Sequence, residues 1–193
     1  MESIRNCSVT IFLSIIYRFT NEPWILCPIT ILHIWILCCH TVSFFGHREV
    51  QNPFRVERRL QNLIQKLLVE HEYVEFLVGR DGEFDQLVAS TIRREWADGW
   101  GKGNSEMNWV QAYPSAVYSQ NMDSFDDYYS NVELCSEAAD AHPKAAIQIR
   151  NRHMVDRSSL VVFYVERRQG GAFQTLRYAE KVGKEFVNLA EEE

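Results

Sequence analysis

A pattern of strand, glycine turn and helix occurs twice between residues 41 and 96, and it constrains the fold more than any other feature. The first copy is a β-branched and aromatic run at 41–45 that ends at a glycine, followed by a helix that starts at Asn52-Pro53. The second copy is a strand at 73–78, again closed by a glycine, and a helix at 83–96. Such alternation is typical of βαβ units, which build a parallel sheet.

The remaining sequence continues this alternation. We expect further strands at 109–113, 132–135, 160–165 and 185–189, helices at 144–156 and 170–181, a glycine-rich loop at 97–105 and a polar and aromatic surface excursion at 114–130. The sequence therefore predicts an α/β fold, namely a Rossmann-like, doubly wound, mostly parallel sheet of five or six strands flanked by helices.

The first 40 residues differ in kind from the rest. No charged residue stands between Glu22 and Arg48, and residues 24–39 are almost wholly apolar. Length and apolarity fit a membrane helix, although Pro28 and the strand expected from residue 41 weaken that interpretation. Sequence read through from a wrongly chosen start, a membrane anchor within 24–45, and a cleaved signal peptide all stay open. We expect residues 1–40 to be a hydrophobic extension and 41–193 to form the domain.

Charge and cysteine content limit the classes of function. The chain has 20 basic and 26 acidic residues, and its net charge of -6 lies wholly within 41–193, which disfavours binding of nucleic acid through bulk charge. No C-x-x-C pair occurs, and the acidic and aromatic run 126–129 is more typical of a surface turn than of a metal site. Only Cys135 lies in 41–193, which favours a reducing compartment. We predict a cytoplasmic protein without metal or cofactor, or a membrane-anchored one if 24–45 spans a bilayer.

Three glycine-containing loops are expected at one edge of the sheet. They are residues 46–48, 79–85 and 170–175, each next to the end of a strand or the start of a helix. In a doubly wound sheet, ligands bind beyond the carboxyl ends of the strands, where helix N-termini and arginines can bind anions. A single glycine in a turn after a strand is common and does not by itself indicate a binding site. Three such loops at one edge favour a ligand that carries phosphate.

Four blocks of the sequence resemble the YpsA-type proteins of the SLOG superfamily, which also includes the DNA-processing protein DprA and the Lonely-guy (LOG) phosphoribohydrolases. The blocks are TVSFFGHRE at 41–49, FLVGRDGEFDQLV at 76–88, HPKAAIQIRNRHMVD at 142–156 and the segment 161–190. The resemblance covers nearly all of 41–190, although loop 97–105 departs from the shorter, lysine-rich link of the family. It implies a Rossmann-like fold and a site for a nucleotide or nucleotide-derived ligand.

The resemblance also implies which residues face the ligand. They are Gly46, His47, Arg48, Gly79, Gly82, Phe84, Asp85, Arg150, Asn151, Met154, Gly170, Gly171 and Thr175. In this assignment the last loop binds phosphate through backbone N–H groups and the Thr175 hydroxyl, while arginines supply countercharge. Asp85 or Asp156 would accept hydrogen bonds from ribose hydroxyls.

The last loop bears on whether the chain is an enzyme. The LOG pattern is P-G-G-x-G-T-x-x-E, whereas residues 169–178 read QGGAFQTLRY, with Tyr178 in place of the glutamate. A phenol cannot replace a carboxylate that stabilises an oxocarbenium-like centre. We therefore favour a non-catalytic or sensory nucleotide-binding protein, compatible with a homo-oligomer and with no nucleic-acid partner. The alternatives are an N-glycosidic hydrolase that uses Glu83 or Asp85, and, less favoured, single-stranded DNA binding of the DprA type.

Overall fold

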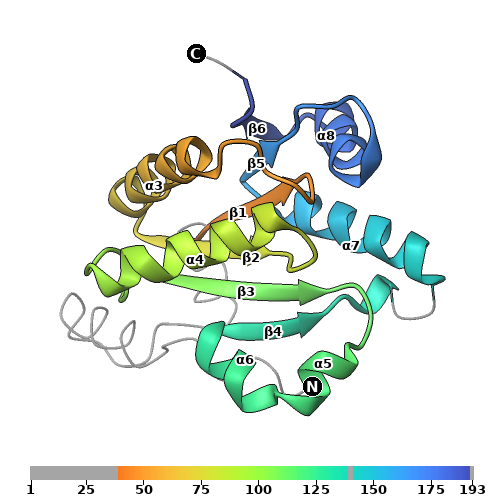
Figure 1. Ribbon diagram of the computed structural model, residues 1–193, viewed down its shortest axis with the longest axis horizontal. Coiled ribbons are helices and arrows are strands. Elements are labelled where there is room, and N and C mark those ends of the chain that lie inside the picture. Colours follow the sequence, from red (N-terminus) through yellow and green to blue (C-terminus); the bar gives the residue numbers. More distant parts are fainter. Residues whose placement is uncertain (1–38, 139–140, 192–193) are drawn as a thin grey trace, which may run out of the picture. The chain divides into compact units, whose positions relative to one another are not determined.

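A computed structural model describes residues 39–138 and 141–191, and one six-stranded sheet with helices on both faces forms its centre (Figure 1). The strands are β1 (Cys39–Gly46), β2 (Tyr73–Val78), β3 (Ser105–Gln111), β4 (Asn131–Leu134), β5 (Leu160–Tyr164) and β6 (Glu185–Asn188). Their order is β4-β3-β2-β1-β5-β6, and every neighbouring pair is parallel. The prediction of a Rossmann-like, doubly wound α/β fold is confirmed.

Alternate strand residues fill two separate cores, one on each face of the sheet. Helices α3 (Pro53–Glu70) and α4 (Glu83–Ala97) pack on the face that carries Val42 and Phe44. Helices α7 (Pro143–Arg157) and α8 (Gly170–Val182) cover the opposite face, which carries Phe45 and Phe163. Because side chains of a strand alternate between its two faces, a run of consecutive apolar residues supplies both cores at once.

Helix α3 starts where the sequence predicts. Asn52 takes a left-handed backbone with φ of 53° and accepts a hydrogen bond from the Arg55 N–H at 3.3 Å, and Pro53 follows at the first helical position. Proline lacks the N–H that this position would leave unbonded, so it favours the start of the helix.

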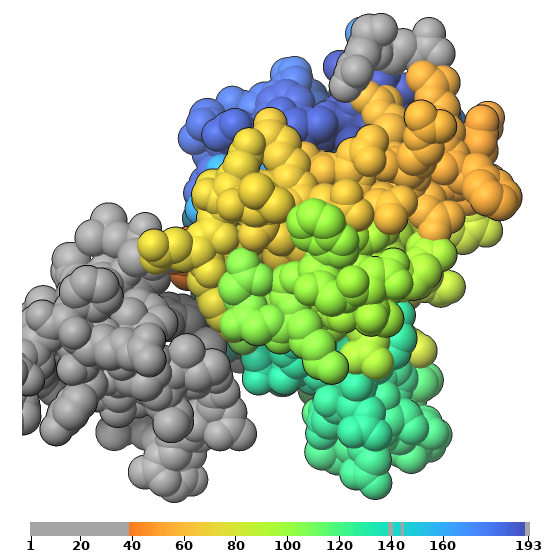
Figure 2. Space-filling model, turned by 90° about the vertical axis from the view of Figure 1, so that its left-hand side faces the viewer, coloured from red at the N-terminus to blue at the C-terminus, as the bar shows by residue number. Residues whose placement is uncertain are grey.

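The segment between α4 and β4 differs from the prediction. Strand β3 begins at Ser105 rather than at residue 109 and ends at Gln111. Two short helices, α5 (Ala116–Gln120) and α6 (Met122–Tyr128), occupy what the sequence predicted as an irregular excursion, and they project from the body in Figures 1 and 2. Each is too short to show a helical period in its sequence. Phe125 of α6 packs on Trp109 of β3, with ring centroids 5.2 Å apart, and this contact anchors the excursion.

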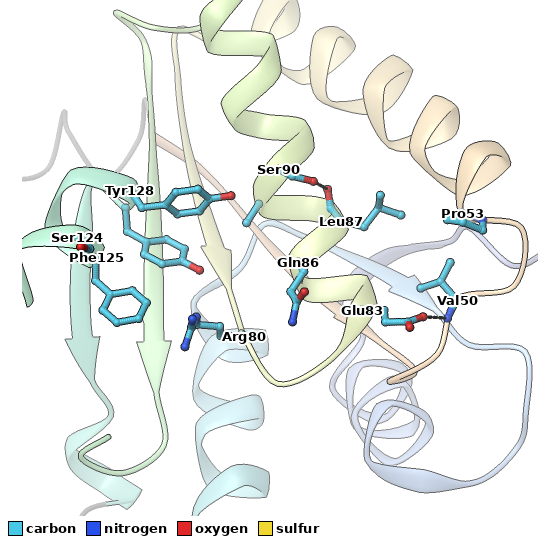
Figure 3. Close-up of a pocket in the computed structure, with 12 residues that line it drawn as sticks. Val50, Pro53, Arg80, Glu83, Gln86, Leu87, Ser90, Ser124, Phe125 and Tyr128 are labelled. Carbon is cyan, nitrogen blue, oxygen red and sulfur yellow. Dashed lines mark hydrogen bonds between the residues drawn. The ribbon is translucent and has the colours of Figure 1, made fainter. Parts of the chain in front are cut away.

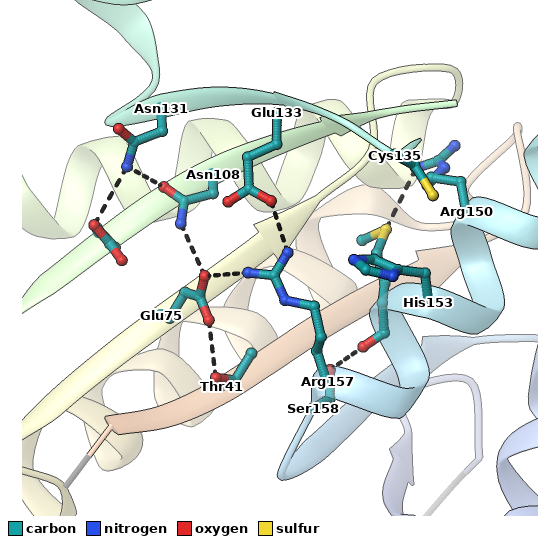
Figure 4. Close-up of polar contacts among 12 residues, drawn as sticks. Thr41, Glu75, Asn108, Asn131, Glu133, Cys135, Arg150, His153, Arg157 and Ser158 are labelled. Atoms are coloured by element: carbon teal, nitrogen blue, oxygen red, sulfur yellow. Dashed lines mark hydrogen bonds and ion pairs between the residues drawn. The ribbon is translucent and has the colours of Figure 1, made fainter. Parts of the chain in front are cut away.

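Strand β3 begins early because its polar residues belong to a hydrogen-bonded ladder across the sheet (Figure 4). Glu75 of β2 accepts hydrogen bonds from Thr41 Oγ1 at 2.9 Å and from Asn108 Nδ2 at 3.0 Å. Arg157, at the end of α7, donates to Glu75 at 2.7 Å and to Glu133 of β4 at 2.6 Å. These bonds satisfy polar groups inside the sheet. Because the first residues of β3 are polar, the alternation of apolar residues does not reveal where the strand begins.

Within residues 39–138 and 141–191, no helix is both long and apolar enough to cross a bilayer. Residues 39–45 of the segment considered as a membrane anchor belong to β1, and the rest of that segment lies outside the described residues. The nature of residues 1–40 and the domain boundary at residue 40 therefore stay predictions.

A short 3-10 helix (Ser136–Ala138) follows β4 and precedes α7.

Candidate functional site

The strand order reverses at β1, so the loop after β1 is the natural centre of a ligand site. This switch-point loop, residues 46–52, contacts both neighbouring loops. His47 Nε2 accepts a hydrogen bond from the Arg167 N–H at 3.1 Å, and the Arg48 carbonyl accepts one from the Glu83 N–H at 2.9 Å. Burial, and then the charge of Arg167, lower the pKa of His47, which favours the neutral imidazole that this bond requires. The three loops predicted from the sequence are thus brought together.

Gly46 and Phe84, two of the predicted ligand-facing residues, are packing partners. A Cβ on Gly46 would lie only 2.3 Å from Cγ of Phe84. The Phe84 ring is fully buried and stacks on Tyr164, with centroids 5.6 Å apart. The absence of a side chain at residue 46 makes room for this ring, and the Phe84 side chain belongs to the core rather than to the surface of the site.

The turn after β2 closes over a buried carboxyl group. Asp85 Oδ2 accepts a hydrogen bond from the Asp81 N–H at 3.0 Å, and a Cβ on Gly79 would lie 2.7 Å from the same oxygen. Burial raises the pKa of Asp85 to about 6, against the opposing effect of Arg150. Gly82 packs against the switch-point loop, since its Cβ would lie 3.1 Å from Cα of Arg48.

Arg150 reaches this turn from α7, on the other face of the sheet. Its side chain is 7% exposed, and its Nη2 lies 3.5 Å from Asp81 Oδ2. Its Nη1 contacts the sulfur of Met154 at 3.6 Å, and Met154 is fully buried. Among the described side chains, Arg150 Nε is one of two buried polar atoms without a hydrogen-bond partner. The second and third sequence blocks therefore meet at this arginine, with Met154 beneath it.

The predicted phosphate loop at the start of α8 is open. Gly170, with φ of 89°, and Gly171 are exposed, and no atom lies within 4 Å of a Cβ built on Gly170. Gln169 precedes the helix without a capping side-chain hydrogen bond, and no acidic residue stands in the first turn. The first N–H groups of a helix carry a partial positive charge. The N-terminus of α8 can therefore receive an anion.

The N-terminus of α4 differs, although its sequence also begins with glycine. Glu83 and Asp85 both stand in its first turn, and the Glu83 N–H is already bonded to Arg48. The carboxylate of Glu83 accepts a hydrogen bond from the Val50 N–H at 2.9 Å. The positive end of this helix is thus neutralised by its own side chains, which disfavours an anion there.

Thr175 and Asn151 connect α8 to α7 below the surface. The Thr175 hydroxyl donates to the Gly171 carbonyl at 2.9 Å and accepts from Asn151 Nδ2 at 3.0 Å, and Thr175 is only 2% exposed. Asn151 Oδ1 is the other buried atom without a partner in the described part of the chain. The hydroxyl expected to bind phosphate is therefore occupied by helix packing in this structure.

Asp156 and Tyr178 lie away from this edge of the sheet. Asp156 stands near the end of α7, towards the amino ends of the strands, and both its carboxylate oxygens accept from the Tyr178 hydroxyl, at 2.9 and 3.0 Å. Asp156 is therefore not placed to accept a bond from a ligand at the carboxyl edge.

A groove of about 710 Å³ opens along α4, beside the switch-point loop (Figure 3). Its lining comes from the switch-point loop and the start of α3, the turn after β2, the first half of α4, and α6 with the residue after it: Val50, Pro53, Arg80, Glu83, Gln86, Leu87, Ala89, Ser90, Ser124, Phe125, Tyr128 and Tyr129. The Arg80 guanidinium lies 4.4 Å from the centroid of the Phe125 ring. Burial raises the pKa of Tyr129 to about 12, so its hydroxyl stays protonated. The sequence analysis did not predict that residues within 124–129 line a groove. The signal that could have indicated it is the cluster of aromatic residues in 125–129.

Two solved structures of DNA processing protein A (DprA) share this fold. The structure from Streptococcus pneumoniae is 15% identical, with a TM-score of 0.57, and the similarity covers 78% of this chain and 50% of that one. The structure from Helicobacter pylori, described for its single-stranded DNA binding mode, is 13% identical, with a TM-score of 0.54 over 78% of this chain and 65% of that one. This chain thus spans half of the first and less than two thirds of the second. No protein-family profile and no curated protein sequence matches it. The similarity shows that this chain shares the fold of these two DprA structures.

Proposed function

We propose that this chain binds a nucleotide or nucleotide-derived small molecule at the carboxyl edge of its sheet, as a YpsA-type member of the SLOG superfamily. The observation that carries the proposal is the open N-terminus of α8, which has neither a capping side chain nor an acidic residue in its first turn. Arg167 and Arg168 immediately precede it with exposed side chains, and Arg48 extends from the adjoining switch-point loop. Backbone N–H groups and guanidinium groups together suit a phosphate.

The groove along α4 supplies the complementary half of such a site. Its volume is in the range of small-molecule sites, and it combines the aromatic residues Phe125 and Tyr128 with polar groups from Arg80 and Gln86. Aromatic and guanidinium faces stack on heteroaromatic rings, and amides bond to their edges. Because the switch-point loop contacts the α8 loop on one side and lines the groove on the other, a ligand that crosses it would place phosphate at α8 and base in the groove.

Binding without hydrolysis is favoured by the positions of the carboxylates. Glu83 and Asp85 each accept a hydrogen bond from a backbone N–H, and Tyr178, at the position of the LOG glutamate, is bonded to Asp156. Asp85 is enclosed by the turn after β2 and Tyr178 is not a carboxylate, so of these three residues only Glu83 lines the groove. We also propose a cytoplasmic location, because Cys135 is a buried thiol outside any disulfide, as a reducing compartment favours.

A thermal-shift screen of the full chain tests the proposal. Nucleoside mono- and diphosphates, ADP-ribose and dinucleotides serve as probes, because a ligand that binds only the native state raises its stability by about 2.7 kcal/mol at a concentration of 100 Kd. Arg48→Ala should weaken the shift, whereas Arg177→Ala, an exposed arginine paired with Glu180 further along α8, should not. Absence of a shift with every probe would refute the proposal.

Single-stranded DNA binding is a second candidate, favoured by the shared fold with DprA, of which the Helicobacter pylori structure is described for that activity. The exposed arginines beside α8 could bind successive phosphates. Salt-sensitive retention of oligodeoxythymidine, with a shallower salt dependence after Arg167→Ala, would support this candidate. If the Arg167→Ala variant retains the oligonucleotide with an unchanged salt dependence, the carboxyl edge of the sheet is not the DNA-binding site.

A further inference from the structure

Three side chains with metal-binding chemistry converge where the end of β4 meets α7, apart from the groove and from the open end of α8. Cys135 follows β4, Glu137 lies in the 3-10 helix, and His153 projects from α7. Glu137 Oε2 lies 3.2 Å from Cys135 Sγ, and Glu137 Oε1 lies 3.0 Å from His153 Nδ1. The three ligand atoms lie within 4.8 Å of one another; Figure 4 draws the cysteine and the histidine.

We infer that Cys135, Glu137 and His153 form a binding site for a zinc-like divalent transition-metal ion. Thiolate, carboxylate and imidazole are the three ligand types that Zn²⁺ takes in proteins, with metal–ligand distances of about 2.0–2.3 Å. On a tetrahedral ion such distances separate neighbouring ligand atoms by roughly 3.3–3.8 Å. The observed separations are close to this range, so small side-chain rotations would admit an ion.

The backbone holds two of the three ligands in place before any ion binds. The Cys135 N–H donates to the Gln111 carbonyl at 2.9 Å, which continues the pairing of β4 with β3, and Cys135 is 2% exposed. His153 is held by α7, where the side chain is 27% exposed. Glu137 is exposed and can turn towards the ion. A site with two fixed ligands and one adaptable carboxylate loses little conformational entropy on binding.

The charge of the site suits a divalent cation. A thiolate and a carboxylate carry two negative charges, which one divalent ion neutralises, and a water molecule can complete four coordination positions. Cysteine and histidine ligands must be deprotonated to bind a metal ion, so affinity should fall as the pH is lowered below neutrality.

Titration of the full, metal-free chain with Co²⁺ tests this inference. We expect one equivalent to bind with the visible spectrum of tetrahedral Co²⁺ and a thiolate-to-cobalt charge-transfer band, both removed by Zn²⁺. Cys135→Ser should abolish the charge-transfer band, and His153→Gln should lower the affinity at least tenfold. His71→Gln, which alters a histidine stacked on His40 at the opposite edge of the sheet, is the matched control and should bind normally.

The four cysteines in residues 1–40 require their own control. A chain with serine at Cys7, Cys27, Cys38 and Cys39 should keep the band, while addition of Cys135→Ser should remove it. Circular dichroism of each variant establishes that it is folded. A band that survives in folded Cys135→Ser, or no thiolate band between pH 7 and pH 8, would overturn the inference.

Discussion

Replacement of Gly46 by alanine tests whether this glycine serves packing or ligand approach. The added Cβ would meet three atoms of Phe84, at 2.3, 2.4 and 2.6 Å, whereas carbon atoms in contact prefer about 3.5–4.0 Å. The ring would have to move by more than about 1 Å to restore that separation.

The surroundings of Phe84 leave little room for such a movement. The ring is fully buried and stacked on Tyr164, and the Tyr164 hydroxyl is itself fixed by bonds to the Gln51 backbone at 3.0 and 3.2 Å. Overpacking of a rigid core costs about 1–3 kcal/mol, and this site should lie at the upper end, near 3 kcal/mol.

Urea unfolding of wild type and Gly46→Ala measures this cost. Gly103→Ala is the matched control, because no atom lies within 4 Å of its Cβ, and its stability should change by less than about 1 kcal/mol. Phe84→Leu should lower the free energy of unfolding less in the Gly46→Ala variant than in wild type. The coupling free energy between the two substitutions should be at least about 1 kcal/mol. If Gly46→Ala unfolds like wild type but loses ligand-induced stabilisation, the packing explanation is wrong.

Three further substitutions test polar groups of the fold by urea unfolding. Because the pKa of Asp85 is raised to about 6, its protonated form stabilises the native state by roughly 2–3 kcal/mol. This stabilisation is complete below about pH 4 and is lost as the pH rises to 6, and Asp85→Asn should abolish this pH dependence. Parallel curves of unfolding free energy against pH for wild type and Asp85→Asn would contradict the raised pKa. Thr175→Val leaves the buried Asn151 amide without its acceptor and should cost about 1–3 kcal/mol; an unchanged midpoint would argue that the hydroxyl is not part of the helix packing. Arg157→Met removes the cation from the polar ladder, where burial and neighbouring carboxylates already raise the pKa of Glu106. The loss of unfolding free energy should therefore be larger at pH 8, where the carboxylates are charged, than at pH 5. Equal losses at the two pH values would count against this charge argument.

Much of the fold could be predicted because local sequence and tertiary structure agree. The apolar run 160–165 and the Asn52-Pro53 start of α3 each carry their structural information within a few residues. The start of β3 does not, since Glu106 and Asn108 are polar and their bonding partners come from neighbouring strands. A strand whose interior is polar can be recognised only once its neighbours are known.

The site was predictable at the level of loops but not of side chains. The three glycine loops converge as expected, because the carboxyl ends of parallel strands share one edge. The function of each side chain depends on contacts distant in sequence: Gly46 on Phe84, and Thr175 on Asn151. Arg80 illustrates the same limit, since its guanidinium lies over rings of Trp109 and Phe125, which only the folded chain brings together.

The charges at the carboxyl edge of the sheet discriminate between a small phosphate ligand and a polyanion better than the net charge of the chain does. Segments 46–52, 79–85 and 165–171 together contain four arginines and five acidic residues, so the edge as a whole is not basic. Binding of a nucleic-acid strand gains affinity from many cationic contacts along its backbone, and interspersed carboxylates oppose this gain. One phosphate needs only a local positive region, and the first turn of α8 provides it without a nearby acid in that turn. The local arrangement thus favours a mononucleotide-sized ligand over single-stranded DNA, even though the fold is shared with DprA.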